Sequence, residues 1–419
     1  MPGFLVDWVR NGEPAVDRLF DRYGDIVSLF LPGIRPNIRR AVVIRDPTVM
    51  KDLISADPAQ VDSTEGNRVL EPLYGDRSLF LLDGPEHRRL RKILLPPLRD
   101  KTLEEWRAMI EDVATRTAAE LPRSTPVALH PRMLRASLEV ILRITVNIDE
   151  KRLDDWLDPM DRLLRIAASE QFSARYLIRQ TGALRRWPTF RRALTRCDEL
   201  VRDEIARRRS TGDSSNDLLG MLLSAPGEPL SDDEIRDQLF TMLIAGHETT
   251  ATSISWAVER LLRHPAALDR LVAESRGGTS EVYARAVVLE TVRLRPPVLV
   301  FARVTRATYQ LGPWQIPPNT LLLPYIRALH EQESLYDEAR FFRPERFLDN
   351  PPGNYTYLSF GGGPHRCLGD RLAVFEAAIF LHALFRELQL EPDPPEDESI
   401  RRKAVTFVPS RRTRVRISG

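Results

Sequence analysis

A glycine-rich segment that ends in a cysteine is the part of the sequence whose residue types point most clearly to chemistry. It runs from Phe360 to Gly369 in the order FGGGPHRCLG. Three consecutive glycines allow backbone angles that other residues avoid, and they let the chain approach a flat ligand closely. Cys367 stands where a helix is predicted to begin, and the free N–H groups at a helix start favour a thiolate over a thiol. The segment therefore predicts a reactive or metal-ligating sulfur.

The alternatives for this cysteine differ in what must lie beside it. A structural zinc site needs four cysteine or histidine ligands at close spacing, and only His365 is near Cys367, which disfavours zinc. A thiolate on a haem iron donates electron density to the metal and favours cleavage of an O–O bond. The remaining alternative is a buried structural cysteine beside a tight turn. The other cysteine, Cys197, lies between Arg196 and Asp198 and is expected to be inert.

A second candidate site is the sequence AGHETT at residues 245–250. Glycine inside a helix costs about 1 kcal/mol relative to alanine, so Gly246 needs a reason, and space for a ligand against the backbone is one. Thr249 can donate a hydrogen bond to the carbonyl four residues earlier, which bends helices. An opened turn beside the pair Glu248 and Thr249 could then hold a water molecule and relay protons. The alternatives are an ordinary packing glycine, or a zinc protease motif; the latter fails because the position four residues after His247 is alanine.

Two sets of charged residues have helical spacing. Glu290 and Arg293 lie three residues apart and therefore on one face of a predicted helix, and Arg346 follows in the segment 344–347. His87 and Arg91 lie four residues apart on another predicted helix. Because such pairs are also common on solvated surfaces, they carry little information on their own.

The elements that must position these residues are mainly helices. Ser231 to Glu234 has the pattern of a capping box, and the apolar periodicity persists from there to Arg263, where His264 and Pro265 stop it. This predicts a helix of about 32 residues, about 48 Å long, that carries the motif at 245–250. The first two predicted strands flank a turn at 32–37 and predict a hairpin. The other expected elements are a mostly helical stretch at 48–225, helices at 279–294 and 368–388, and strands at 26–31, 41–44, 308–311 and 321–325.

Composition limits the class of protein. The chain has 419 residues, of which 42% are hydrophobic, so it can bury a large core. Its 61 basic and 59 acidic residues give a net charge of +2 and are interleaved, which excludes a basic stripe for nucleic acid. Two cysteines cannot form a disulfide framework and fit a reducing compartment. No window approaches the ~20 apolar residues that span a bilayer, so the sequence predicts a soluble, cytoplasmic protein.

The segment 360–369 resembles the cysteine-loop signature of the cytochrome P450 family: a phenylalanine, a glycine, a basic residue, the ligand cysteine and a following glycine. Ala373, six residues after the cysteine, fits the same pattern. Three further segments occur in the order found in the family, so the resemblance extends from about Asp83 to Ala373. It implies a mainly α fold with a small β region, formed by one domain over residues 1–419. The β-rich portion would come from about 26–46 and 298–326, and haem b would lie between the long helix and the cysteine loop.

The resemblance also implies roles for individual residues. Cys367 would be the axial ligand of the haem iron, Thr249 would stabilise bound dioxygen, and Glu248 would assist proton delivery. Glu290, Arg293 and Arg346 would form a buried network that braces the cysteine loop and does no chemistry. The remaining cofactor contacts implied by the family pattern are Ala245, Gly246, Phe360, Gly361 and Gly369 around the ring, and His87, Arg91, Arg303 and His365 at the propionates.

The reaction implied by the resemblance is insertion of one oxygen atom from O₂ into an apolar organic substrate, by hydroxylation or epoxidation, with electrons from NAD(P)H. One alternative is a peroxide-driven hydroxylase or an isomerase on the same scaffold, and Glu248 with Thr249 argues against it. Another is a non-catalytic haem-binding sensor or carrier, which substrate-dependent NAD(P)H consumption would distinguish.

The motifs leave no room for a flavin or iron–sulfur domain, so a ferredoxin-type donor with its NAD(P)H reductase is expected, acting on a monomer. Its expected docking surface lies over Cys367 and would be supplied by Arg88, Arg89, Lys92, Arg366 and Arg371, unless these are ordinary solvated side chains. The substrate stays open among fatty acids, steroids, terpenes and polyketides. The stretches expected to line its cavity are 62–82, 163–190, 298–301 and the region around Phe407.

Overall fold

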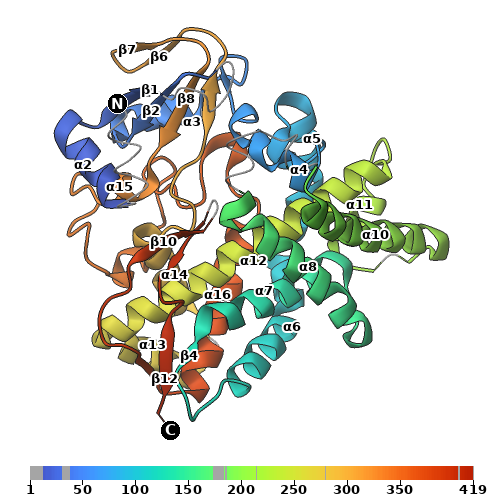
Figure 1. Ribbon diagram of the computed structural model, residues 1–419. Coiled ribbons are helices and arrows are strands. Elements are labelled where there is room, and N and C mark those ends of the chain that lie inside the picture. Colours follow the sequence, from blue (N-terminus) through green and yellow to red (C-terminus); the bar gives the residue numbers. More distant parts are fainter. Residues whose placement is uncertain are drawn as a thin grey trace.

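The longest helix, α12 (Asp232–Arg263), runs through the middle of the helical part of the molecule (Figure 1). Ser231 caps it: its hydroxyl accepts a hydrogen bond from the Glu234 N–H, and the Glu234 carboxylate accepts one from the Ser231 N–H at 2.9 Å. The helix ends at Arg263, and α13 begins at Pro265. The observed capping box, the length of 32 residues and the end at Arg263 confirm the predicted long helix.

The computed structural model describes residues 13–30, 38–172, 184, 186–213, 215–278, 280–403 and 406–418.

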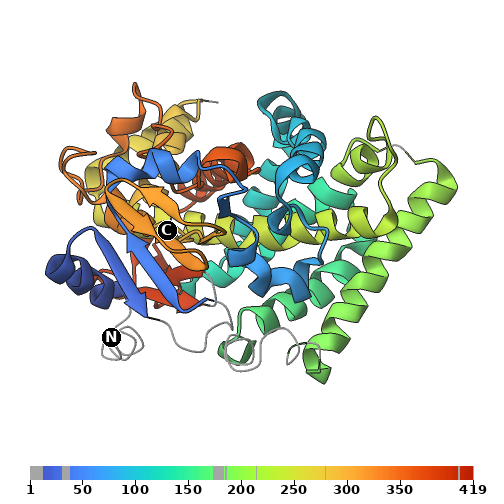
Figure 2. The ribbon, with the colours of Figure 1, turned by 90° about the horizontal axis from the view of Figure 1, so that it is seen from above.

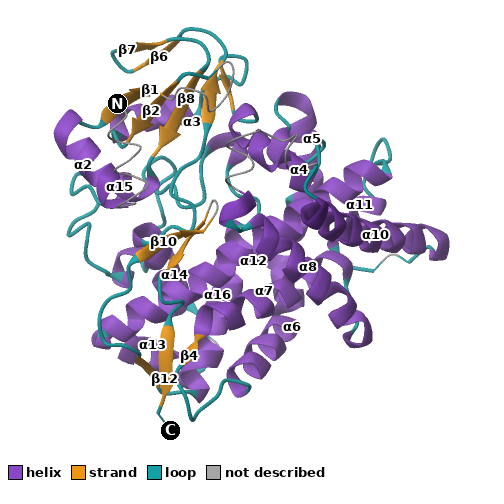
Figure 3. Ribbon diagram, in the orientation of Figure 1, coloured by secondary structure: helices purple, strands orange, loops and turns teal. Residues whose placement is uncertain are grey.

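Other helices surround α12 and bury its apolar side chains (Figure 3). Those packed directly on it include α7 (Leu129–Val146), α10 (Pro188–Thr211), α13 (Pro265–Gly277), α14 (Val282–Leu294) and α16 (Asp370–Glu387). Helix α6 (Asp100–Ala119) packs on α7 and α16, and α8 (Leu153–Ala167) packs on α10. The shorter helices are α2 (Glu13–Tyr23), α3 (Met50–Ile54), α4 (Glu71–Tyr74), α5 (Gly84–Leu94), α11 (Leu218–Leu223) and α15 (Ile326–His330).

A five-stranded sheet lies to one side of the helices (Figure 2). Its order is β1 (Ile26–Phe30), β2 (Arg40–Ile44), β8 (Thr320–Pro324), β5 (Arg303–Thr305) and β3 (Val61–Asp62). β1 and β2 pair antiparallel with Ile26 opposite Ile44, which confirms the predicted pairing; residues 31–37, which include the predicted turn, lie outside the described residues. β2 and β8 are parallel, and this brings the chain near residue 42 beside residue 322.

Several short strands were not predicted. The sequence predicts a strand at 308–311 followed by a turn, whereas the structure pairs β6 (Tyr309–Leu311) with β7 (Trp314–Ile316), which lies inside the expected turn. Near the C-terminus, β10 (Ile400–Lys403) pairs with β11 (Thr406–Pro409), and β12 (Arg414–Ile417) lies between β4 (Val127–Ala128) and β9 (Leu390–Pro392). Each of these strands has only two to four residues, which is too short for a reliable alternation pattern in the sequence.

The architecture confirms the expected mainly α fold with a small β region. Among the helices that the structure describes, none combines the length and apolar character that a membrane crossing requires.

Candidate functional site

The cysteine loop is held by its own backbone. The Cys367 N–H donates to the Phe360 carbonyl at 2.8 Å, and the Gly361 N–H donates to the Leu358 carbonyl at 2.8 Å. Gly361 and Gly363 have φ angles of 67° and 65°, in the left-handed region that favours glycine. The loop thus needs glycine at these two positions for its conformation alone.

Close packing explains why glycine stands at position 362, whereas no contact within the described protein explains the glycine at position 369. A Cβ at Gly362 would lie 2.9 Å from the Ile54 side chain, and a Cβ at Gly363 would lie 2.5 Å from the Ile54 carbonyl oxygen, so the loop is pressed against the end of α3. At Gly369, by contrast, a Cβ would meet no atom within 4 Å. No contact within the described protein requires glycine there, which fits the expectation of a flat ligand against this side of the loop.

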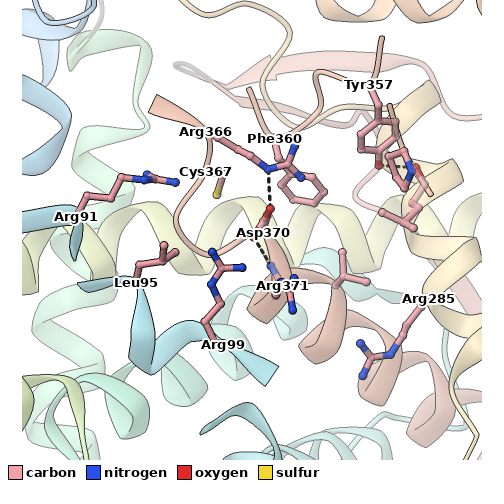
Figure 4. A pocket seen from close by; sticks show the side chains of 13 residues that line it. Arg91, Leu95, Arg99, Arg285, Tyr357, Phe360, Arg366, Cys367, Asp370 and Arg371 are labelled. Carbon is pink, nitrogen blue, oxygen red and sulfur yellow. Dashed lines mark hydrogen bonds and ion pairs between the residues drawn. The ribbon is translucent and has the colours of Figure 1, made fainter. Parts of the chain in front are cut away.

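The Cys367 side chain is exposed at a cavity of about 500 Å³ (Figure 4). Protein atoms packed around the sulfur nevertheless raise the pKa of Cys367 to about 11 by burial, and Asp370 acts in the same direction. The Gly369 N–H, Arg91 and Arg366 oppose this rise without cancelling it. The N–H group at the helix start thus acts in the predicted direction, but burial of the sulfur outweighs it. A metal cation bound to the sulfur would remove the proton, because a coordinated thiol is deprotonated outright.

Arginines dominate the lining of this cavity. Asp370 is the one carboxylate in it; Arg366 donates to Asp370 at 2.9 Å, and the Arg371 backbone N–H does so at 2.8 Å (Figure 4). The lining residues come from α5, α14, α16 and nearby loops: Arg91, Leu95, Arg99, Arg285, Leu289, Pro352, Tyr357, Phe360, Arg366, Cys367, Asp370, Arg371 and Val374. None comes from α12.

Of the five cations expected at a docking surface, two line the cavity and three lie outside its lining. Arg366 and Arg371 line the cavity, whereas Arg88 and Lys92 are exposed outside its lining. Arg89 is exposed outside the cavity lining and forms an ion pair with Glu234 at 2.8 Å, at the start of α12. Arg99 and Arg285, which sequence reasoning missed, also line the cavity; Arg285 lies on α14, the helix that carries Glu290 and Arg293.

The four basic residues expected at the propionates come together from three segments. The rings of His87 and His365 stack with their centroids 4.1 Å apart. Burial lowers the pKa of His87 to about 4, with His365 and Arg91 acting in the same direction. Burial also lowers the pKa of His365, and the charge of Arg303 lowers it further. Asp83, the N-cap of α5, accepts a hydrogen bond from His365 at 3.2 Å if that ring nitrogen carries the proton.

Arg303 provides a direct test of fit to an anionic group. It is buried, and burial lowers its pKa to about 10, while Asp83 and Asp62 oppose the shift. Within the described residues its guanidinium donates to the Ala302 carbonyl at 3.0 Å and makes no ion pair. Because buried charges are normally paired, the cluster of Arg303, His87, His365 and Arg91 suits a ligand with carboxylates. A haem with two propionates meets that requirement.

On α12, the hydroxyl of Thr249 donates to the Ala245 carbonyl at 2.8 Å, as predicted. The helix is continuous through this point, without the opened turn that the sequence suggested. Gly246 has a packing reason: a Cβ there would lie 3.1 Å from the side chain of Ile141 on α7. Gly246 therefore serves the contact between two helices, which is one of the two reasons that the sequence offers for it. His247 is buried, with Nδ1 3.2 Å from the Leu243 carbonyl, which agrees with a structural role.

Glu248 has a partner that was missed in the sequence. Lys403, the last residue of β10, donates to the Glu248 carboxylate at 2.8 Å. The two residues are separated by 155 positions in the chain, and one lysine in a C-terminal stretch gives no sequence signal for such a contact.

The expected ion network is present behind the loop. Arg293 donates to Glu290 at 2.7 Å, and both side chains are fully buried; Arg346 donates to the same carboxylate at 3.1 Å. His330 was missed: the Leu358 N–H donates to its Nε2 at 2.9 Å, so Nδ1 carries the proton and donates to the Arg293 carbonyl at 3.0 Å. The network thereby reaches the backbone two residues before Phe360.

Two side chains extend this support along α14. The Tyr357 hydroxyl donates to the Leu289 carbonyl at 2.9 Å, and the Ser359 hydroxyl donates to the Val292 carbonyl at 2.8 Å. Residues 357–359 are thus attached to one helix face immediately before the cysteine loop. Cys197, in contrast, is fully buried on α10, and burial raises its pKa to about 12.

Comparison with known proteins gives a consistent result. A family model described as Cytochrome P450 matches residues 5–414. The chain is 36% identical to "Putative cytochrome P450 137" of Mycobacterium tuberculosis, with 99% of this chain and 87% of the relative covered. It is 33% identical to "Putative cytochrome P450 135B1" of Mycobacterium bovis, covering 98% and 88%. It is 31% identical to "Putative cytochrome P450 135A1" of Mycobacterium tuberculosis, covering 100% and 94%.

Proposed function

The chain belongs to the cytochrome P450 family, and from this premise we propose that it inserts one oxygen atom from O₂ into an apolar organic substrate, by hydroxylation or epoxidation. As a member of the family it is an oxidoreductase of the haem-thiolate monooxygenase class with haem b as cofactor. Haem bound through a thiolate supplies the activation of O₂ for this chemistry. The observation that carries the assignment is Cys367, whose exposed side chain stands on a glycine loop fixed from behind by a buried network.

We assign the cofactor contacts to this chain's residues as follows. Cys367 would ligate the iron, and the loop residues Phe360, Gly361 and Gly369 would border the ring on the same side. Ala245 and Gly246 of α12 would border it on the other side. The propionates would be held by His87, Arg91, Arg303 and His365, where Arg303 is buried without an anionic partner among the described residues.

Proton handling is assigned to Glu248 and Thr249. They are neighbours on the buried middle of α12, and their side chains are an acid and an alcohol, which can hold and pass a proton. The Thr249 hydroxyl donates its hydrogen bond to the Ala245 carbonyl. The two lone pairs of the hydroxyl oxygen can then accept hydrogen bonds from water.

Electrons would come from NAD(P)H through a separate ferredoxin-type donor and its reductase, and we propose that the chain acts as a single catalytic domain and as a monomer in the cytoplasm. The arginine-lined cavity beside Cys367 supports an acidic partner, since charges of one sign in a concave surface attract the opposite sign. The substrate would be apolar and would contact residues from 62–82, 163–190, 298–301 and the region of Phe407; of these, 173–183 and 185 lie outside the described residues.

The test compares two neighbouring threonines. Thr249 and Thr250 each donate to the carbonyl four residues earlier at 2.8 Å, so their local roles in the helix are matched. Thr249→Ala should keep NAD(P)H oxidation and divert oxygen to hydrogen peroxide, while Thr250→Ala stays coupled to product formation. Product and peroxide would be measured per NAD(P)H consumed. Full coupling of Thr249→Ala with several substrates would remove Thr249 from the mechanism.

A further inference from the structure

The acid of the α12 motif is held by a residue from the C-terminal part of the chain. Lys403 Nζ lies 2.8 Å from Glu248 Oε1, and the two side chains are 31% and 16% exposed. Among the described residues, Lys403 is the one cation within 4.0 Å of this carboxylate. A half-buried ion pair of this kind is less screened by water than a surface pair, so it constrains both side chains more strongly.

The hairpin that carries Lys403 is itself attached to α12. The Trp256 indole N–H donates to the Phe407 carbonyl on β11 at 3.1 Å. Trp256 lies eight residues after Glu248, a little over two turns along the helix and about 80° further around it. The Phe407 N–H donates to the Pro297 carbonyl at 2.9 Å. The hairpin β10–β11 thus bridges α12 and the chain at Pro297, which directly precedes the stretch 298–301 assigned above to the substrate.

The groups around this ion pair leave Lys403 as the charge that balances Glu248. His130 of α7 is buried, and burial lowers its pKa to about 3, with Lys403 and Arg412 acting in the same direction, so its ring is neutral at neutral pH. His247 on α12 is also buried, and burial lowers its pKa. Tyr74 of α4 has its pKa raised, first by burial and then by the charge of Glu248.

We propose that Lys403 is a positioning residue for proton delivery. It holds the Glu248 carboxylate in one orientation beside Thr249, and it ties the β10–β11 hairpin to that acid. This inference rests on the proposed monooxygenase function. The physical reason is conformational: a glutamate side chain has several rotamers, and the ammonium group of Lys403 selects among them. Without it, Glu248 is free to turn toward bulk water.

The first experiment measures coupling in the haem-loaded enzyme for three variants. Lys403→Met removes the ammonium group, Lys403→Arg keeps a cation, and Arg401→Met removes an exposed cation two residues away on the same strand. Lys403→Met should lower product per NAD(P)H several-fold, lower kcat with little change in KM, and increase the solvent deuterium isotope effect on kcat. Lys403→Arg should recover at least half of the loss, and Arg401→Met should match the wild type.

The second experiment does not depend on turnover. Amide hydrogen exchange in peptides that cover β10 and β11 should be several-fold faster in Lys403→Met and in Glu248→Gln. The double variant should be no faster than either single variant, because both remove the same contact. Additive effects would overturn the inference.

Normal coupling in Lys403→Met, or no recovery in Lys403→Arg, would also overturn it. Neither result touches the proposed function, which the Thr249→Ala and Thr250→Ala comparison tests separately.

Discussion

Two regions of the molecule each contain a cysteine and a buried arginine–carboxylate network, and the proposed haem site lies at one of them. On α10, Cys197 lies eleven positions before Arg208, as the chain runs, and Arg208 pairs with Glu204 and Asp217 in a buried cluster. At the second region, Cys367 follows a loop that the Glu290 and Arg293 network supports. The residue types are alike, so the difference must come from the backbone.

In α10 the cysteine is one position of a regular helix, and its side chain is enclosed by the core. At the loop, left-handed glycines and the hydrogen bond from Cys367 to Phe360 turn the cysteine out of the core, so its side chain is exposed to a cavity lined by arginines. A buried network around Arg208 stabilises a helix end, whereas the network around Arg293 also fixes the start of a loop. The predictions below separate these two outcomes.

The largest effect is expected from breaking each network. Arg293→Met and Arg208→Met each remove the buried guanidinium from a network of buried carboxylates, which costs about 3–5 kcal/mol in the free energy of unfolding. Urea unfolding should show similar losses for the two variants. Only Arg293→Met should also lose haem from the protein that stays folded, because only that network supports residues 357–359. Equal haem retention in the two variants would contradict the distinction.

A pH effect should appear at the loop. Burial lowers the pKa of His330 to about 3, and its neutral ring accepts the Leu358 N–H. The unfolded chain binds a proton below about pH 6.5 and the folded protein does not, so stability falls as the pH drops from 6.5 toward 3. At pH 5 this amounts to about 2 kcal/mol. The free energy of unfolding should therefore fall less between pH 7 and pH 5 in His330→Gln than in the wild type, although the variant is less stable at pH 7. An equal fall in both proteins would exclude His330 as the cause of the pH dependence.

Two glycines with nearly the same backbone angle give a matched comparison. Gly361 in the loop has φ 67°, and Gly212, which caps the C-terminus of α10, has φ 66°. Replacing either by alanine should cost about 1–2 kcal/mol, since both place a Cβ in the left-handed region. Thermal unfolding should show similar shifts, while only Gly361→Ala should alter the Soret spectrum. A spectral change in Gly212→Ala would mean that strain at α10 reaches the site.

The smallest effect concerns the arginine-lined cavity. Arg99→Glu should slow reduction by an acidic ferredoxin several-fold at low salt and flatten the salt dependence, because exposed charges are screened over about 8 Å at physiological ionic strength. Arg132→Glu, which changes an exposed arginine outside the cavity lining, is the charge-matched control and should leave the rate near that of the wild type. A rate indifferent to salt in all proteins would place the donor elsewhere.

The elements and contacts that could be predicted from the sequence are those whose residues lie close together along the chain. The capping box at Ser231, the end of α12 at Arg263 and the bond from Thr249 to Ala245 depend on residues within four positions of each other or on one continuous pattern. The pairing of Glu290 with Arg293 is of the same kind.

The rest depends on contacts between distant parts of the chain. Lys403 reaches Glu248 across 155 positions, and His330 reaches Leu358 across 28. Gly246 is explained by Ile141 on a different helix, and Arg89 by Glu234. Spacing along the sequence contains no information about such neighbours, so these contacts could not be predicted from it.

The central claim is that Cys367 is the haem ligand and that Cys197 is not. The ferrous–CO spectrum of the purified protein tests it most directly, in the wild type and in the two single Cys→Ser variants. The account predicts the Soret band typical of thiolate ligation in the wild type and in Cys197→Ser, and loss of that band in Cys367→Ser with the protein still folded. Retention of the band in Cys367→Ser, or its loss in a folded Cys197→Ser, would contradict the account.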